Sequence, residues 1–134
     1  MKIVTSFARF AALLAALVIG PLLTTAYAGS TAPYTQEAFK AAQAAGQPIL
    51  VEVHADWCPT CKAQESVLNA LKTDPKFDKL VTFRVNYDQQ KQVLREFNAQ
   101  AQSTLIVFKG ASEVGRSVGD TRRASIESLV GKSL

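Results

Sequence analysis

The stretch from Ile49 to Lys62, ILVEVHADWCPTCK, constrains the fold more than any other part of this 134-residue chain. It opens with an apolar, β-branched run of strand length directly after the breaker Pro48, which predicts a buried strand over residues 49–54. Pro59 suits the first turn of a helix, where its missing N–H is not needed, and apolar residues recur at helical spacing after it. We therefore expect a strand to end and a helix to begin around two cysteines.

Cys58 and Cys61 occupy this junction, separated by two residues. The first turn of a helix offers free backbone N–H groups and a partial positive charge, and both favour a thiolate over a thiol. Cys58 is therefore the expected nucleophile. Cys61 lies one turn further along, where the fold would shield it, and it is the expected resolving thiol of a mixed disulfide formed on Cys58. Such a pair can exchange two electrons with a disulfide in another protein.

The motif WCPTCK, with Trp57 before the first cysteine and Lys62 after the second, resembles the active-site motif of the thioredoxin family. The longer string ADWCPTCK is particularly similar to the C-terminal thioredoxin-like domain of DsbD-type periplasmic reductases. The likeness extends from about Tyr34 to the C-terminus. It implies an α/β thioredoxin fold with a central mixed sheet flanked by helices on both faces. It also implies a thiol–disulfide oxidoreductase that acts on protein disulfides and has no cofactor other than the Cys58–Cys61 disulfide.

The first 28 residues are expected to be a cleaved signal peptide. Lys2 and Arg9 form a positive n-region, residues 10–23 are almost entirely apolar, and Ala26-Tyr27-Ala28 has the small-x-small pattern of a signal-peptidase site. The alternative is an uncleaved anchor, but the apolar stretch is shorter than the roughly 20 residues that span a bilayer. We therefore predict an exported protein, located in a bacterial periplasm.

The mature chain is expected to be one domain over residues 34–134, preceded by a short leader, residues 29–33, that need not be ordered. Removal of residues 1–28 leaves 106 residues with 13 basic and 11 acidic side chains, a net charge of +2. That balance is too slight to indicate binding to nucleic acid or to a membrane surface. We expect a monomer whose partners are disulfide-containing proteins and an exported or membrane-bound thiol donor.

Hydrophobic periodicity and turn residues predict the remaining elements. Two strands joined by a short turn close the sheet, and a final helix follows. In order, we expect a helix over 34–45 capped by Thr35, the strand 49–54, a helix over 59–71, a helical turn around Phe77 after Asp74-Pro75, a strand over 81–87, a helix over 88–97 capped by Asp88, strands over 104–109 and 114–118, and a helix capped by Asp120 or Thr121 with Ile126, Leu129, Val130 and Leu134 on one face.

Glu52 places a carboxylate in the middle of a strand that would be buried on both faces. Burial disfavours the charged carboxylate and so favours uptake of a proton. A base that works near neutral pH requires this property. In thioredoxins a buried acid lies six residues before the first cysteine, and the resemblance casts Glu52 as the proton acceptor for Cys61. The alternative is a strand-edge glutamate whose carboxylate reaches water.

Four neighbours have two interpretations each. By resemblance, Lys62 and Arg84 match basic positions that can stabilise a thiolate or carboxylate, whereas each is otherwise a solvated surface charge. His54 shares a strand face with Glu52 and could bias the thiolate or carry a proton, or could be a packed, hydrogen-bonded histidine. Trp57 is expected to shape the surface beside the first cysteine and contact a substrate rather than fill the core.

The loop before strand 104–109 departs from the family. Thioredoxin-like proteins carry a cis-proline there in the pattern x-Pro-Thr, whereas this chain has Gln102, Ser103 and Thr104. A cis peptide bond costs about 3–4 kcal/mol before residues other than proline, so the Gln102–Ser103 bond is expected to be trans. The substrate loop should then be shaped differently, and Ser103 could donate a hydrogen bond to a thiolate.

Three other uses of the two cysteines compete with dithiol exchange. A purely structural bridge between residues only three apart would constrain the unfolded chain little. A closed zinc site needs four ligands, and one chain has two cysteines and one histidine. No metal is therefore expected within one chain. The rival of a different class is a dimeric module in which the cysteines of two chains hold a metal or cluster.

The two residues between the cysteines bear on the direction of electron flow. Pro59-Thr60 between the cysteines matches neither the Gly-Pro associated with thioredoxin nor the Pro-His of strong oxidants. The expected buried acid and the DsbD-like string favour a protein-disulfide reductase. A disulfide oxidant or isomerase of the same fold is the alternative.

Overall fold

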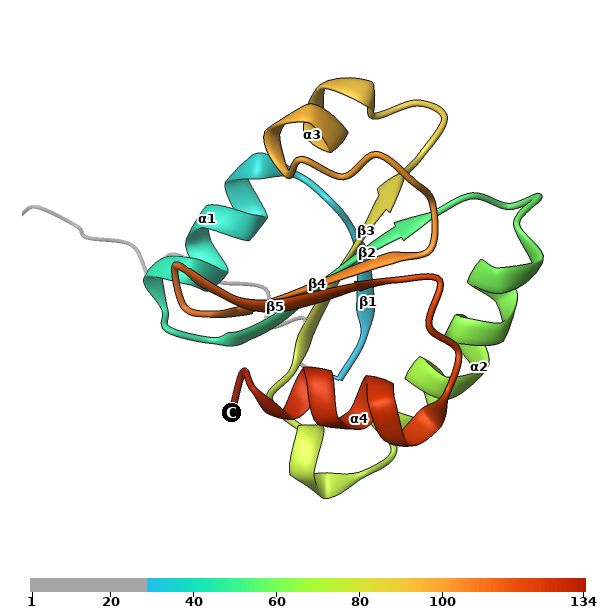
Figure 1. Cartoon of the computed structure of the whole chain (residues 1–134). Helices are drawn as coiled ribbons and strands as arrows, with labels where there is room; N and C mark the ends of the chain where they lie inside the picture. The colour runs from blue at the N-terminus through green and yellow to red at the C-terminus, as the bar shows by residue number, and fades with distance from the viewer. Residues whose placement is uncertain (1–28) are drawn as a thin grey trace, which may run out of the picture.

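The structure is a computed structural model that describes residues 29–134, so the predicted signal peptide lies outside the described residues. Its elements alternate between strands and helices around one sheet (Figure 1). Within the described range, no helix combines the length and apolar character needed to cross a membrane. In chain order the elements are β1 (Thr31–Pro33), α1 (Gln36–Ala44), β2 (Pro48–His54), α2 (Pro59–Lys72), the 3-10 helix η1 (Pro75–Phe77), β3 (Val81–Asn86), α3 (Lys91–Glu96), β4 (Thr104–Lys109), β5 (Ser112–Val118) and α4 (Arg123–Gly131).

Strand β2 is the middle strand of a five-stranded sheet with the order β1-β3-β2-β4-β5. It pairs in parallel with β3 and antiparallel with β4, while β1 runs parallel to β3 and β5 antiparallel to β4. Helices α1 and α3 lie on one side of the sheet, and α2 and α4 lie on the other (Figure 1). The predicted α/β class, a mixed sheet flanked by helices on both faces, is confirmed.

Each face of the sheet carries its own hydrophobic core, because successive strand residues point to opposite faces. Val51 and Phe83 pack against α1 and α3 together with interlocking aromatic rings, including the T-shaped pair of Phe39 and Phe97. Leu50 and Leu71 belong to the opposite core, which joins β2 and β4 to α2, η1 and α4. The strand residues that alternate with Val51 and Phe83 therefore face α2, and this set includes the polar side chains of β2 and β3.

Strand β1 corrects the prediction for residues 29–33. Thr31, Ala32 and Pro33 pair with residues 82–84 of β3, and the backbone N–H of Tyr34 donates to the Arg84 carbonyl at 2.8 Å. The composition of this segment is small and polar, and its strand character comes from backbone pairing with β3. Within this segment, Thr31–Pro33 is an edge strand and not part of a loose leader.

Helix α3 begins later than predicted. It starts at Lys91, and Gln90 occupies the N-cap position without a side-chain cap. Asp88, the predicted cap, instead accepts a hydrogen bond from the Trp57 indole at 2.9 Å. The intervening turn is held by Asn86, whose side-chain oxygen accepts from the backbone N–H groups of residues 88 and 89. A long-range contact has replaced the local cap.

Helix α4 also differs at both ends from the prediction. It starts at Arg123, and the Asp120 carboxylate accepts hydrogen bonds from the Arg122 backbone and the Ser125 hydroxyl without occupying the N-cap position. Ile126 and the other predicted apolar residues inside the helix are buried, but Leu134 is 42% exposed. Leu134 lies beyond the helix, which ends at Gly131, so its side chain leaves the helical face.

Candidate active site

Cys58 and Cys61 form a disulfide at the junction of β2 and α2, with their Cα atoms 5.2 Å apart. Cys58 is the N-cap of α2, and its sulfur accepts a hydrogen bond from the backbone N–H of Cys61 at 3.1 Å. Pro59 follows in the first turn, and a backbone hydrogen bond from Cys58 to the Ala55 carbonyl closes the turn after β2. The strand-to-helix placement predicted for the pair is observed. It brings the backbone N–H of Cys61, in the first turn of α2, to the Cys58 sulfur, and such a contact favours the thiolate.

Both cysteines are shielded from solvent in this disulfide state. Cys58 is 2% exposed and Cys61 is 1% exposed. The Cys61 sulfur lies 4.0 Å from the carbonyl oxygen of Val53 on the central strand. Around the pair, Thr60 is half-buried, whereas Lys62 is exposed. The position of Lys62 therefore matches its interpretation as a solvated charge at the rim of the site.

Trp57 lies on the surface beside the disulfide, as predicted. Its side chain is well exposed, yet its position is fixed by the hydrogen bond to Asp88 and by a T-shaped contact with Tyr87, whose ring centroid is 6.3 Å away. Lys91 in turn places its ammonium 4.0 Å from the Tyr87 ring centroid. Asp88 thus orients an aromatic side chain at the site, a role that its position after a strand did not indicate.

Glu52 is buried, with 1% of its side chain exposed, and it faces the α2 side of the sheet. Arg84 is its register partner on β3, and the guanidinium donates to both carboxylate oxygens, from Nε at 3.2 Å and from Nη2 at 3.4 Å. The prediction of a buried carboxylate is confirmed, and the alternative of a strand-edge glutamate is wrong. Arg84 likewise is the ion-pair partner of a buried acid and not a freely solvated charge.

Glu65 of α2 shares the same guanidinium and was not identified from the sequence. Its carboxylate accepts from Nη2 of Arg84 at 2.8 Å. This hydrogen bond lowers the pKa of Glu65, whereas burial acts to raise it. For Arg84, burial acts to lower the pKa, but Glu65 and Glu52 outweigh it and the pKa is raised. The guanidinium is thus a fixed positive charge between two carboxylates.

His54 lies two residues beyond Glu52 on the same face of β2 and is 7% exposed. Its Nδ1 is 3.5 Å from Oε1 of Glu52, and its Nε2 is 3.5 Å from Oδ1 of Asp56. Among residues 29–134, Nδ1 has no hydrogen-bond partner. The imidazole is therefore packed beside the buried acid, but it is not saturated with hydrogen bonds as a purely structural histidine would be.

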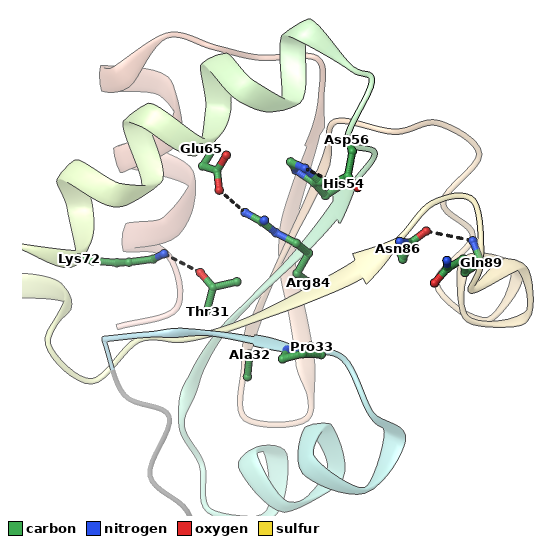
Figure 2. Close-up of a pocket in the computed structure, with 10 residues that line it drawn as sticks. All are labelled: Thr31, Ala32, Pro33, His54, Asp56, Glu65, Lys72, Arg84, Asn86 and Gln89. Carbon is green, nitrogen blue, oxygen red and sulfur yellow. Dashed lines mark hydrogen bonds and ion pairs between the residues drawn. The ribbon is translucent and has the colours of Figure 1, made fainter.

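A polar cavity of about 450 Å³ opens between α2 and the β1–β3 edge of the sheet (Figure 2). Its walls include Arg84 and His54, the two basic side chains that contact Glu52. Helix α2 supplies Glu65 and Lys72 opposite them. The lining residues are Thr31, Ala32, Pro33, His54, Asp56, Glu65, Lys72, Arg84, Asn86 and Gln89.

The loop before β4 has the trans Gln102–Ser103 peptide expected from the sequence, and residues 29–134 contain no cis bond. Ser103 adopts a positive φ of 57°, which few residues other than glycine accept. Its N–H donates to the Val53 carbonyl at 2.9 Å, and its carbonyl accepts from Gly119 at 2.9 Å. Its hydroxyl donates to the Gln102 carbonyl at 2.6 Å, not to a cysteine sulfur. Thr104 follows as a buried residue at the start of β4.

Gln64 also holds this loop and was missed in the sequence. It is completely buried on α2, and its Nε2 donates to the carbonyls of Ser103 at 3.0 Å and Asp120 at 2.9 Å. It therefore links α2, the helix that carries Cys61, to the loop before β4 and to the loop before α4. Its position three residues after Cys61, on the buried face of the helix, was the available signal.

The described part of the chain contains no group of three or more His, Cys, Asp or Glu side chains arranged to hold a metal ion.

Comparisons with known proteins agree with this geometry. The family model described as Thioredoxin matches residues 30–132. The thioredoxin of Chlamydia trachomatis serovar D is 32% identical over 98 residues, which cover 73% of this chain and 93% of that protein. A bifunctional thioredoxin reductase/thioredoxin of Mycobacterium leprae is 30% identical over 74% of this chain, which spans only 22% of that longer protein. The crystal structure of Trxlp from Edwardsiella tarda EIB202 is 44% identical, with a TM-score of 0.73 over 75% of this chain and 98% of that one.

Proposed function

The chain belongs to the thioredoxin family and has its fold, and from this premise we propose that it is an exported thiol–disulfide oxidoreductase that reduces disulfides in other proteins. The observation that carries the proposal is the position of Cys58. Its sulfur caps α2 and receives the Cys61 N–H, which favours the thiolate needed for attack on a disulfide.

In the proposed cycle the Cys58 thiolate attacks one sulfur of a substrate disulfide and displaces the other as a thiolate. Cys61 then transfers its proton to Glu52 and attacks the Cys58 sulfur of the mixed disulfide. The Cys58–Cys61 disulfide forms, the second substrate sulfur leaves as a thiolate, and two electrons have passed to the substrate. The cycle needs no dissociable cofactor, and a monomer can complete it.

Two features support Glu52 as the proton acceptor. It is buried on the sheet face that α2 covers, the helix that carries Cys61. It is also held by Arg84, whose permanent charge keeps the carboxylate in place without competing for the proton. An exported or membrane-bound thiol donor would return electrons to the Cys58–Cys61 pair after each turnover.

The chemistry is tested with single cysteine variants and a disulfide-bonded protein substrate. Cys58→Ser should abolish reduction, and Cys61→Ser should trap the substrate as a mixed disulfide on Cys58. Reduction by Cys58→Ser at the wild-type rate would refute the proposal.

The direction of electron flow is tested by equilibrating the protein with a thiol–disulfide buffer. A potential near that of thioredoxin, about −270 mV, supports a reductase, whereas one near −120 mV indicates an oxidant. Export is tested separately by cell fractionation and by the mass of the isolated protein, which should begin at Gly29.

A further inference from the structure

We propose that His54 relays protons between Glu52 and solvent during thiol–disulfide exchange. The proposal rests on the role of Glu52 as proton acceptor for Cys61. It adds the route by which that proton leaves the protein, through the polar cavity between α2 and the sheet edge.

Glu52 needs such a route because its own contact with solvent is minimal, at 1% side-chain exposure. Two basic side chains of the described residues lie within 4 Å of its carboxylate, Arg84 and His54. A guanidinium remains protonated and only donates hydrogen bonds, so Arg84 cannot accept a proton from Glu52. An imidazole both accepts and releases protons near neutral pH, so His54 is the neighbour with the required chemistry.

The geometry forms a path of increasing exposure. Nδ1 of His54 lies 3.5 Å from Oε1 of Glu52 and has no hydrogen-bond partner among residues 29–134. Nε2 of the same ring is 3.5 Å from Oδ1 of Asp56, whose side chain is 96% exposed. His54 and Asp56 both line the cavity (Figure 2). The ring therefore connects an almost inaccessible carboxylate to an almost fully solvated one.

The relay moves protons only. A neutral imidazole with its proton on Nε2 accepts the proton of Glu52 on Nδ1, and the resulting imidazolium releases its Nε2 proton to Asp56 or to solvent. One proton enters the ring and one leaves it, and no electron is transferred. Exchange with solvent in the cavity restores the starting tautomer. Oxidation of a substrate would use the same path in reverse.

Other charges face the ring and set its surroundings. Besides Glu52 and Asp56, the cavity brings Glu65 and Lys72 of α2 and Arg84 of β3 to the same space. These charged side chains are all retained in the His54 variants, so the test changes the imidazole alone. Gln89 supplies a matched control, because its exposed side chain lines the same cavity and is not in contact with Glu52.

The decisive measurement is the single-turnover rate at which Cys61 resolves a mixed disulfide on Cys58, followed by stopped flow over a range of pH. His54→Gln should lower this rate about tenfold near pH 7, which is less than the roughly 10²–10⁴-fold contribution of a group that transfers the proton directly. Gln89→Ala should resolve at the wild-type rate. Attack on the substrate by Cys58 should be unchanged in both variants.

Chemical rescue separates a relay from a structural role. His54→Ala leaves room beside the cavity, and added imidazole should restore resolution in that variant, with substituted imidazoles acting in the order of their pKa values. Resolution by His54→Gln at the wild-type rate would overturn the relay, as would a failure of every imidazole to restore His54→Ala. Glu52→Gln distinguishes the two proposals. A normal resolution rate in Glu52→Gln would refute the role of Glu52 as the proton acceptor. A slow resolution rate in Glu52→Gln together with a normal rate in His54→Gln would refute only the relay through His54.

Discussion

Replacement of Arg84 by methionine would leave the Glu52 carboxylate buried without the guanidinium that donates to both of its oxygens. Removing one partner of a buried ion pair costs about 3–5 kcal/mol. Two observations place the cost of breaking this ion pair at the lower end of that range. The Arg84 side chain is 31% exposed, and its contacts of 3.2 and 3.4 Å are longer than those of the strongest charge-assisted bonds. We therefore expect Arg84→Met to lower the free energy of unfolding at pH 7 by about 3 kcal/mol.

Urea unfolding at pH 7 measures this effect. For a domain of this size, with a slope of roughly 1–2 kcal/mol per molar urea, the midpoint should fall by about 2 M. The double variant Glu52→Gln/Arg84→Met removes the unpaired charge and should recover most of the loss. Glu65→Gln is the matched control, because it removes the more exposed partner of the same guanidinium and should cost less than about 1 kcal/mol.

The double-mutant cycle decides the interpretation. If the destabilisation arises from a buried charge without a partner, the effects of Glu52→Gln and Arg84→Met will be strongly non-additive. Additive effects, or a loss below about 1 kcal/mol in Arg84→Met, would show that Glu52 does not depend on Arg84 and would refute the reasoning.

The remaining predictions concern two other side chains of α2. Gln64→Leu removes the hydrogen bonds to the carbonyls of Ser103 and Asp120 and should destabilise the protein by about 1–2 kcal/mol, with faster amide exchange at Ser103; unchanged exchange there would contradict the tethering role. Arg84 lowers the pKa of Glu65 below its usual 4.5, so their ion pair stabilises the fold above that pH and this contribution is lost as the pH falls through the lowered pKa. Below pH 4.5 the unfolding free energy of the wild type should therefore fall more steeply than that of Glu65→Gln, and parallel curves would refute the prediction.

The parts of the fold that the sequence predicts well are those with a local cause. Pro59 after a β-branched run places the start of α2, and alternation over residues 81–86 gives β3. The Cys58–Cys61 spacing similarly places both thiols on the first turn of one helix. In each case the side chains themselves carry the periodicity or the backbone constraint, so neighbouring residues suffice for the prediction.

The parts that were missed depend on residues far apart in the chain. Strand β1 exists because its backbone pairs with β3, about 50 residues later, and its composition carries no strand pattern. Asp88 is a residue type that commonly caps helices, but its carboxylate instead accepts a hydrogen bond from Trp57, 31 residues away in the sequence. Gln64 and Glu65 read as ordinary polar helix positions until the fold brings Ser103 and Arg84 against them. The local pattern can place Gln64 on the buried face of α2, but it does not identify the partners that these side chains meet in the fold.

The central position of β2 determines how well the reacting groups keep their arrangement while the protein fluctuates. Local opening begins where hydrogen-bond partners are fewest, at the edges of a sheet, and β2 is separated from each edge by two strands. The strand that carries Glu52 and His54 and leads directly to Cys58 is therefore the last to lose its partners from either side. The Cys58–Cys61 disulfide, which is made and broken in every catalytic cycle, thus lies next to the part of the sheet that opens last. Fraying of β1 or β5 therefore leaves the alignment of thiol, acid and imidazole intact.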